Sequence, residues 1–208
     1  MPHVEASPYC FKCDVCHTRC DGVSKGVYIF ENDTSFSEQY EQEIISIINA
    51  SGTLFAKKSD EMGYPDITVY DKEGGIRTYV EVKVQQRTFM SVRKYLPESK
   101  LFPSETVALN LSDLLRYFGI QAQTKISTSI VWVLLNRPCV TKEAKHLYFF
   151  QSIDKLKQVY DATGKRRRFR RKSGEGDMVE GQHKGVTVNY HFSLKELKQW
   201  TPGKLPRM

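Results

Sequence analysis

The chain has 208 residues, of which 40% are hydrophobic and 26% are charged, and its formal net charge is +7. It is long enough to bury a core of its own, as one domain or as one domain with a small appendage. Its apolar runs fall short of the roughly 18 residues of a membrane span, and its first residues lack the charged-then-apolar pattern of a secretion signal. The sequence therefore predicts a globular, cytoplasmic protein with no membrane partner.

Four of the five cysteines gather near the N-terminus, in the run CFKCDVCHTRC. Such close spacings suit a shared metal better than disulfides, because a reducing compartment disfavours disulfides and a tight turn brings the thiolates together. Zinc is the usual ion for four such ligands, and the spacing also matches an iron–sulfur run, although aspartate rather than proline follows the last cysteine here. We predict a structural Zn²⁺ segment over residues 1–24, with an iron–sulfur cluster or no metal as alternatives. The predicted ligands are Cys10, Cys13, Cys16 and Cys20.

Helical signals follow over residues 34–52, TSFSEQYEQEIISIINASG. Ser35 with Glu38 three residues later is a capping-box pattern, and Gly52 is a stop signal. Isoleucines at helical spacing form an apolar stripe, and Glu41 lies at the N-terminal end of that stripe. The pattern predicts an amphipathic helix that carries a glutamate beside its buried face.

The rest of the chain alternates apolar runs with short helical patterns and contains no internal repeat. Strands are predicted at residues 26–30, 53–58, 66–70, 79–84, 129–136 and 146–153. Further helices are predicted at 109–120 and 152–163, and residues 185–200 are predicted to form a strand and then a short helix. This order predicts an α/β fold with a mixed central sheet flanked by helices, in a domain spanning residues 25–208.

Three charged residues stand on the hairpin predicted within GYPDITVYDKEGGIRTYVEVKV. Because strand side chains alternate between faces, Glu81 and Lys83 share one face of YVEVKV while valines take the other. Glycines in DKEGG can supply the positive φ of a tight turn. A turn at Glu73-Gly74 places Asp66 opposite Glu81, and a turn one residue later places it opposite Lys83. Either register leaves the three charged residues on one face.

Two carboxylates beside a lysine are suited to holding Mg²⁺ or Mn²⁺ near a phosphate. These ions prefer oxygen ligands, lower the pKa of a bound water and neutralise charge on a phosphate in phosphodiester hydrolysis. The lysine could orient the attacking water or stabilise the anion that forms. An ordinary surface hairpin with a cross-strand Glu–Lys pair is the alternative interpretation.

The residues Pro65-Asp66, fourteen further residues and then Glu81-Val82-Lys83 resemble the PD-(D/E)xK signature. That restriction-endonuclease-like superfamily holds restriction enzymes, Holliday-junction resolvases and repair and phage nucleases. The order of predicted elements over residues 35–135 is also similar: a helix with a glutamate, a strand, the PD strand, the ExK strand and a helix. The resemblance implies a metal-dependent nuclease but does not identify its substrate.

The resemblance also implies two additional site residues. An upstream helix glutamate often joins the metal site in this superfamily, and Glu41 is the match here, with Glu38 and Glu43 as alternatives. A glutamine shortly after the lysine can assist, which implies Gln85 ahead of Gln86, because Gln85 shares the parity of Glu81. The implied catalytic set is Glu41, Asp66, Glu81, Lys83 and Gln85, of which Glu41, Asp66 and Glu81 would bind Mg²⁺ or Mn²⁺.

The positive charge is confined to one run, KRRRFRRK, which holds seven of the 31 basic residues. Without this run, 24 basic residues face 24 acidic ones. Such runs commonly contact phosphate backbones, and a phenylalanine among the arginines can stack on an exposed base or pack onto the protein body. A disordered loop within 163–185 or an acidic protein partner are the alternatives. The predicted nucleic-acid contacts are Lys165, Arg166, Arg167, Arg168, Phe169, Arg170, Arg171 and Lys172.

Two function classes follow from these observations. The first is a Mg²⁺- or Mn²⁺-dependent endonuclease acting on DNA, with a junction- or structure-specific nuclease as its second form. The other is a nucleic-acid-binding module that keeps the fold without cutting. Two carboxylates held where phosphates would bind favour the nuclease. The sequence leaves open whether the protein forms a homodimer.

Overall fold

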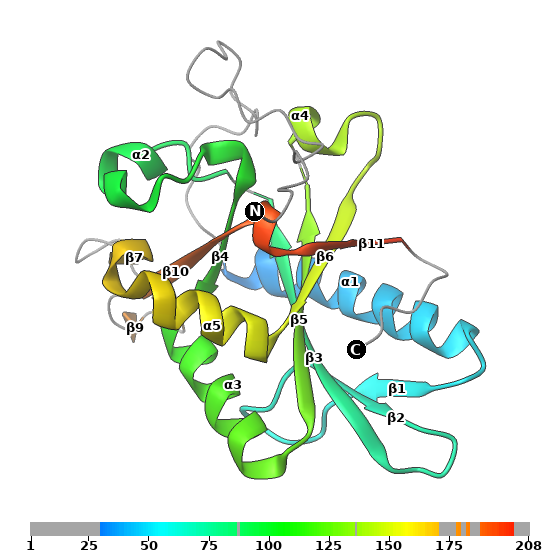
Figure 1. The fold of residues 1–208 in the computed structure, drawn as a ribbon. Helices are drawn as coiled ribbons and strands as arrows, with labels where there is room; N and C mark the ends of the chain where they lie inside the picture. The colour runs from blue at the N-terminus through cyan, green and yellow to red at the C-terminus, as the bar shows by residue number, and fades with distance from the viewer. Residues whose placement is uncertain are drawn as a thin grey trace, which may run out of the picture.

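A six-stranded mixed sheet forms the centre of the protein, whose computed structural model describes residues 30–86, 88–135, 137–170, 178–179, 182–183 and 188–201 (Figure 1). The strand order is β1-β2-β3-β5-β6-β11, and only β3 and β5 run parallel among these neighbours. The strands are β1 (Phe55–Lys58), β2 (Ile67–Tyr70), β3 (Ile76–Gln85), β5 (Ser127–Leu134), β6 (Leu147–Ser152) and β11 (Lys198–Trp200). This arrangement confirms the predicted α/β fold with a mixed central sheet.

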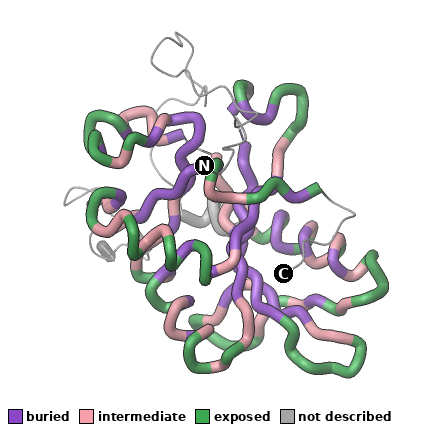
Figure 2. Tube along the Cα trace, in the orientation of Figure 1, coloured by how far each residue is buried: buried purple, intermediate pink, exposed green. Residues whose placement is uncertain are grey.

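Helices cover both faces of this sheet. Helix α1 (Phe30–Ala50) packs Tyr40, Ile44 and Ile48 against the valines of β3 and the apolar residues of β2. On the other face lie α3 (Leu111–Thr124) and α5 (Ile153–Thr163), whose buried side chains join the central strands in a second core. Strand β5 is buried along almost its whole length, and β3 is buried over its middle (Figure 2). The sheet thus separates two apolar layers.

A second, three-stranded sheet adjoins the α3 and α5 layer. Its order is β4-β10-β7, and both strand pairs are antiparallel. The strands are β4 (Thr106–Asn110), β7 (Arg168–Arg170) and β10 (Val188–Ser193), and β8 (Met178–Val179) pairs with β9 (Gln182–His183) nearby in sequence. Short helices complete the described residues: α2 (Val92–Tyr95), α4 (Pro138–Thr141) and the 3₁₀ turns at Pro97–Ser99, Pro103–Glu105, Gly164–Arg167 and Leu194–Glu196. No helix in these ranges is both long and apolar enough to cross a bilayer.

The hairpin of β2 and β3 adopts one of the two predicted registers. Ile67 pairs with Val80 and Thr68 with Tyr79, so continuing the ladder places Asp66 opposite Glu81. The turn itself is longer than two residues, because the ladder shifts by one residue at the far end of β2. Oδ1 of Asp71 accepts hydrogen bonds from the backbone N–H groups of Glu73 and Gly75 at 3.0 and 2.8 Å, and Gly74 adopts a φ of 83°. A side-chain cap and one left-handed glycine therefore close the loop.

Several elements differ from their predicted form. Helix α1 begins at Phe30, so Ser35 lies inside it and is not its cap. Phe30 was expected to end a strand over residues 26–30, whose other residues lie outside the described ranges. Residues 198–200 form the edge strand β11 rather than the end of a helix, because they pair with β6 and bury Trp200. Residues 164–170 form a turn and then β7 where a loop was expected, since β7 pairs with β10.

Candidate metal-binding active site

The predicted charged residues of the hairpin meet where β2 begins, beside the middle of β3. Asp66 immediately precedes β2, while Glu81 and Lys83 stand in β3. Oδ2 of Asp66 accepts a hydrogen bond from the backbone N–H of Val82 at 2.8 Å, and the backbone N–H of Asp66 donates to Oε2 of Glu81 at 3.3 Å. Nζ of Lys83 forms an ion pair with Oε1 of Glu81. The hairpin thus places two carboxylates and one ammonium group in contact.

Burial makes this cluster electrostatically unusual. Glu81 is only 2% exposed, whereas Asp66 and Lys83 are half-buried. Burial raises the pKa of both carboxyl groups, and the charge of Lys83 offsets this only in part. Burial also opposes the charge of Lys83, but the two carboxylates outweigh it and raise the lysine pKa above its usual value. The lysine is therefore held protonated, but its single charge does not fully compensate the two carboxylates.

This incompletely compensated carboxylate charge is the feature that favours a bound cation. A divalent ion is often the largest local charge in such a site, and it lowers the pKa of its carboxylate ligands. Within the described ranges, no three His, Cys, Asp or Glu side chains gather as a ready-made metal cage. Mg²⁺ nevertheless needs only one or two carboxylates, because waters and substrate phosphates complete its coordination. Asp66 and Glu81 meet that requirement.

Glu41 approaches the site from α1. Its side chain is buried, and Oε2 lies 3.3 Å from Nζ of Lys58 without accepting a hydrogen bond among the described residues. Lys58 pairs with Ile67 in the sheet, so this contact lies next to the start of β2. The charge of Glu41 contributes to the raised pKa of Asp66, after the larger effect of burial. Glu41 thus lies close enough to Asp66 to influence its ionisation.

The two alternative glutamates of α1 have other surroundings. Glu38 is exposed and accepts a hydrogen bond from Nζ of Lys58 at 3.1 Å. Oε1 of Glu43 lies 3.5 Å from Nε2 of His146, which immediately precedes β6. Neither glutamate is among the main causes of the raised pKa of Asp66, whereas Glu41 is.

Gln85 follows the site along β3 and makes contacts of a different kind. Its side-chain carbonyl accepts a hydrogen bond from the backbone N–H of Ala108 at 3.1 Å, and its main-chain carbonyl accepts one from Leu135. These bonds tie β3 to β4 and to the end of β5. A catalytic role for Gln85 stays a prediction.

Helix α3 supplies residues that sequence reasoning missed. Tyr117 interacts with the Glu81 carboxylate, whose burial-raised pKa it partly lowers, and its hydroxyl accepts a hydrogen bond from Nη2 of Arg116 at 3.3 Å. Burial and the neighbouring Glu81 raise the pKa of Tyr117, so the hydroxyl keeps its proton. The same Nη2 of Arg116 lies 2.9 Å from Oδ1 of Asp113. The sequence signal was only the i, i+3, i+4 spacing of three polar residues on a predicted helix.

The basic run is anchored to the protein body over its described part. Nη1 of Arg167 lies 2.7 Å from Oε2 of Glu196, and the Arg168 guanidinium donates to the hydroxyl of Tyr160. The ring centre of Phe169 lies 4.9 Å from that of Phe89 and 5.1 Å from that of Tyr95. Packing of the phenylalanine onto the body is therefore what the structure contains.

The remaining members of the run differ in accessibility. Arg166 is exposed and donates to the carbonyl groups of Ala162 and Thr163 at 2.8 and 3.1 Å. Lys165 and Arg170 are also exposed. Arg171, Lys172 and the four N-terminal cysteines lie outside the described residues, so the Zn²⁺ or iron–sulfur segment stays a prediction.

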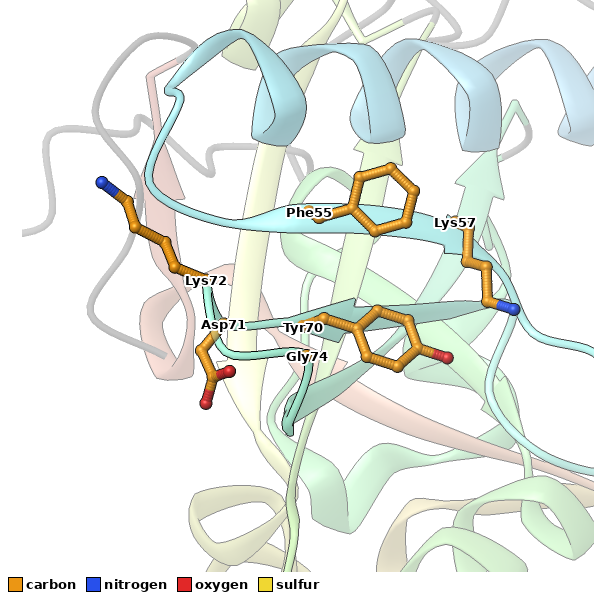
Figure 3. A pocket seen from close by; sticks show the side chains of 6 residues that line it. All are labelled: Phe55, Lys57, Tyr70, Asp71, Lys72 and Gly74. Atoms are coloured by element: carbon orange, nitrogen blue, oxygen red, sulfur yellow. The ribbon is translucent and has the colours of Figure 1, made fainter.

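A separate hollow lies near the β2–β3 turn. It encloses about 350 Å³ and is lined by Phe55, Lys57, Tyr70, Asp71, Lys72 and Gly74 (Figure 3). The rings of Phe55 and Tyr70 are 6.2 Å apart, and Nζ of Lys57 is held by Asp60 at 2.6 Å. Tyr70 stands four positions beyond Asp66, which in a strand amounts to about 13 Å. The hollow is therefore distinct from the carboxylate pair.

Comparison with known proteins gives a weak structural likeness and no match by sequence. No protein-family model matches the chain, and no curated protein matches its sequence. Among solved structures, the chain is similar to Archaeoglobus fulgidus Hjc, a Holliday junction resolvase from an archaeal hyperthermophile. The TM-score is 0.40 with 8% sequence identity, over 76% of this chain and 83% of the resolvase. At this level of likeness the functional proposal rests on the chain's own residues.

Proposed function

We propose that the protein is a divalent-metal-dependent nuclease of the PD-(D/E)xK type that hydrolyses phosphodiester bonds in DNA. One observation carries the proposal: the half-buried Asp66 and the buried Glu81 lie side by side, and Lys83 compensates their charge only in part. A structural hairpin gains nothing from burying two carboxylates side by side, because burying incompletely compensated charge is costly. A site that receives a cation and a phosphate does require such an arrangement.

Each residue then has a definite role. Asp66 and Glu81 would hold Mg²⁺ or Mn²⁺, and Glu41 would add charge or a water-mediated contact from α1. When bound, such an ion supplies a water of lowered pKa and neutralises charge on the phosphate. The backbone N–H of Val82 fixes the Asp66 carboxylate through its bond to Oδ2, which leaves Oδ1 without that restraint.

Lys83 contributes a permanent positive charge. Because its raised pKa keeps it protonated at neutral pH, it suits an electrostatic role toward the phosphate rather than that of a general base. Its ion pair with Glu81 holds the ammonium group beside the carboxylates. Replacing Lys83 with methionine should therefore slow cleavage without removing either carboxylate.

A substrate panel tests the proposal. Purified protein is incubated with supercoiled plasmid, linear duplex, single-stranded DNA, a four-way junction and RNA, in Mg²⁺ or Mn²⁺ and in EDTA. We expect metal-dependent cleavage of at least one DNA substrate, with preference for the junction indicating a structure-specific enzyme. Absence of cleavage across the panel, with binding retained, would instead establish a non-catalytic binding module.

Matched variants separate the protein's own activity from a contaminant. Glu81→Gln removes a ligand charge at constant shape, whereas Glu73→Gln makes the same change at an exposed position of the hairpin loop. We expect cleavage to be lost in the first and kept in the second. The pair Glu41→Gln and Glu43→Gln tests the helix glutamate, and loss confined to Glu43→Gln would show that Glu41 is the wrong choice.

A further inference from the structure

Arg116 stands at the edge of the carboxylate cluster, although it lies outside the hairpin motif. Its Nη2 donates to the hydroxyl of Tyr117 at 3.3 Å, and Tyr117 in turn interacts with Glu81. The same Nη2 lies 2.9 Å from Oδ1 of Asp113. Asp113, Arg116 and Tyr117 follow i, i+3, i+4 spacing, so they share one side of α3. One helix thus connects an arginine to a candidate metal ligand through a single hydroxyl.

The loop that leads into Asp66 borders the same arginine. A Cβ added at Gly63 would lie 3.9 Å from Cδ of Arg116, so the backbone of this loop passes close to the arginine stem. Gly63 has a φ of 86°, which side chains other than glycine rarely adopt. Arg116 therefore lies between the segment that positions Asp66 and the residue that contacts Glu81.

Part of the guanidinium group is available to a ligand. All contacts of Arg116 with hydrogen-bonding partners in the described ranges use Nη2, so Nη1 and Nε donate to no described residue. The side chain is 42% exposed. A guanidinium has five N–H donors in one plane. Those on Nη1 and Nε can thus each donate to a phosphate oxygen while Nη2 stays bound.

The side chain is also held in place before any ligand arrives. Its guanidinium carbon lies 5.1 Å from the centre of the Tyr117 ring, and Tyr117 itself is buried in the core. An isolated Asp–Arg pair on a helix surface would have neither the tyrosine contact nor the connection to Glu81. Fixing a long side chain in advance reduces the entropy lost on binding.

We propose that Arg116 binds a substrate phosphate next to the cleaved bond, and that Asp113 and Tyr117 position its guanidinium group for this contact. The inference rests on the proposed nuclease function and adds a substrate contact to it from α3. Lys83 and Arg116 would then approach the phosphates from two different elements, with Glu81 between them.

Nucleic-acid binding without added divalent cation tests this role apart from cleavage. Fluorescein-labelled duplex DNA and a labelled four-way junction are titrated by anisotropy over a range of salt concentrations. The variants are Arg116→Gln, Arg116→Lys and the control Arg77→Gln, which makes the same charge change at an exposed position of β3. The unfolding temperature of each variant is measured alongside.

We expect Arg116→Gln to weaken binding by about tenfold and to reduce the log–log salt slope by about 0.9 on the duplex. Arg116→Lys should keep the slope but regain only part of the affinity, because an ammonium group lacks the planar array of donors that Asp113 and Tyr117 hold in place. Arg77→Gln should match the wild type. Tyr117→Phe should weaken binding in the wild type but have no further effect in Arg116→Gln, as expected if the hydroxyl acts through the arginine.

The outcomes separate this inference from the proposed function. Wild-type affinity and slope in Arg116→Gln would overturn the phosphate contact, even if the wild type cleaves DNA. A Tyr117→Phe effect that persists in Arg116→Gln would overturn the positioning role. If the wild type binds but does not cleave, the nuclease proposal fails while the salt slope still decides the role of Arg116. If it binds no nucleic acid, both fail.

Discussion

A divalent cation should stabilise the folded protein through Asp66 and Glu81. Both carboxyl groups have a pKa raised by burial, and Lys83 offsets this only in part, so their ionised forms are costly until more positive charge arrives. A cation present at ten times its dissociation constant stabilises the folded state by about 1.4 kcal/mol. For a domain of this size, 1 kcal/mol corresponds to about 2–4 °C. The unfolding temperature should therefore rise by about 3–6 °C.

The assay is thermal unfolding, followed by calorimetry or fluorescence, as Mg²⁺ or Mn²⁺ is added to protein dialysed into metal-free buffer. Asp66→Asn and Glu81→Gln should abolish the rise, and Glu73→Gln should keep it. Protons compete with the metal for carboxylates of raised pKa, so the rise should shrink as the pH is lowered from about 7.5 toward about 5. An undiminished rise in Glu81→Gln would refute the assignment of the cation to this pair.

Three further predictions concern other parts of the molecule. Burial lowers the pKa of His191 to about 4, so below about pH 6.5 the unfolded chain binds more protons than the folded protein. Relative to His191→Gln, the stability of the wild type should therefore fall by up to about 3 kcal/mol toward pH 4, as measured by urea unfolding. Arg167→Gln should cost about 1.5–3 kcal/mol by removing the charged hydrogen bond to the partly buried Glu196, whereas Lys165→Gln and Arg170→Gln should spare stability and each reduce the DNA salt slope by about 0.9. The four N-terminal cysteines should hold about one zinc per chain by elemental analysis. Iron with sulfide would indicate an iron–sulfur cluster instead, and the absence of both metals would refute both predictions.

The hairpin could be predicted from sequence because its information is local. Alternation of side chains placed Glu81 and Lys83 on one face, and the paired strands confirm that the valines take the other. The register followed one of two turn positions, although the Asp71 cap lengthened the loop. The alternation of side chains between the two faces of a strand does not depend on the length of the turn.

Contacts between distant segments could not be predicted in the same way. Tyr117 reaches Glu81 across 36 sequence positions, and nothing in the helix pattern specifies which strand residue it meets. The edge strand β11 has a sequence with helical character, and pairing with β6 overrides that local preference. Arg167 belongs to a charge run typical of a loop, yet its ion pair with Glu196 comes from a segment far along the chain.

The most direct test of the nuclease proposal is the single-turnover cleavage rate with Mn²⁺ on the best substrate of the panel. Wild type, Asp66→Asn, Glu81→Gln and Glu73→Gln are compared at equal fractions of bound DNA. Loss of an outer-shell partner typically costs 10–100-fold in a metal site, so loss of a direct ligand should cost about 100-fold or more. We predict that the Asp66 and Glu81 variants fall by at least this factor while Glu73→Gln cleaves at the wild-type rate. Cleavage by Glu81→Gln within a few-fold of wild type would contradict the proposal.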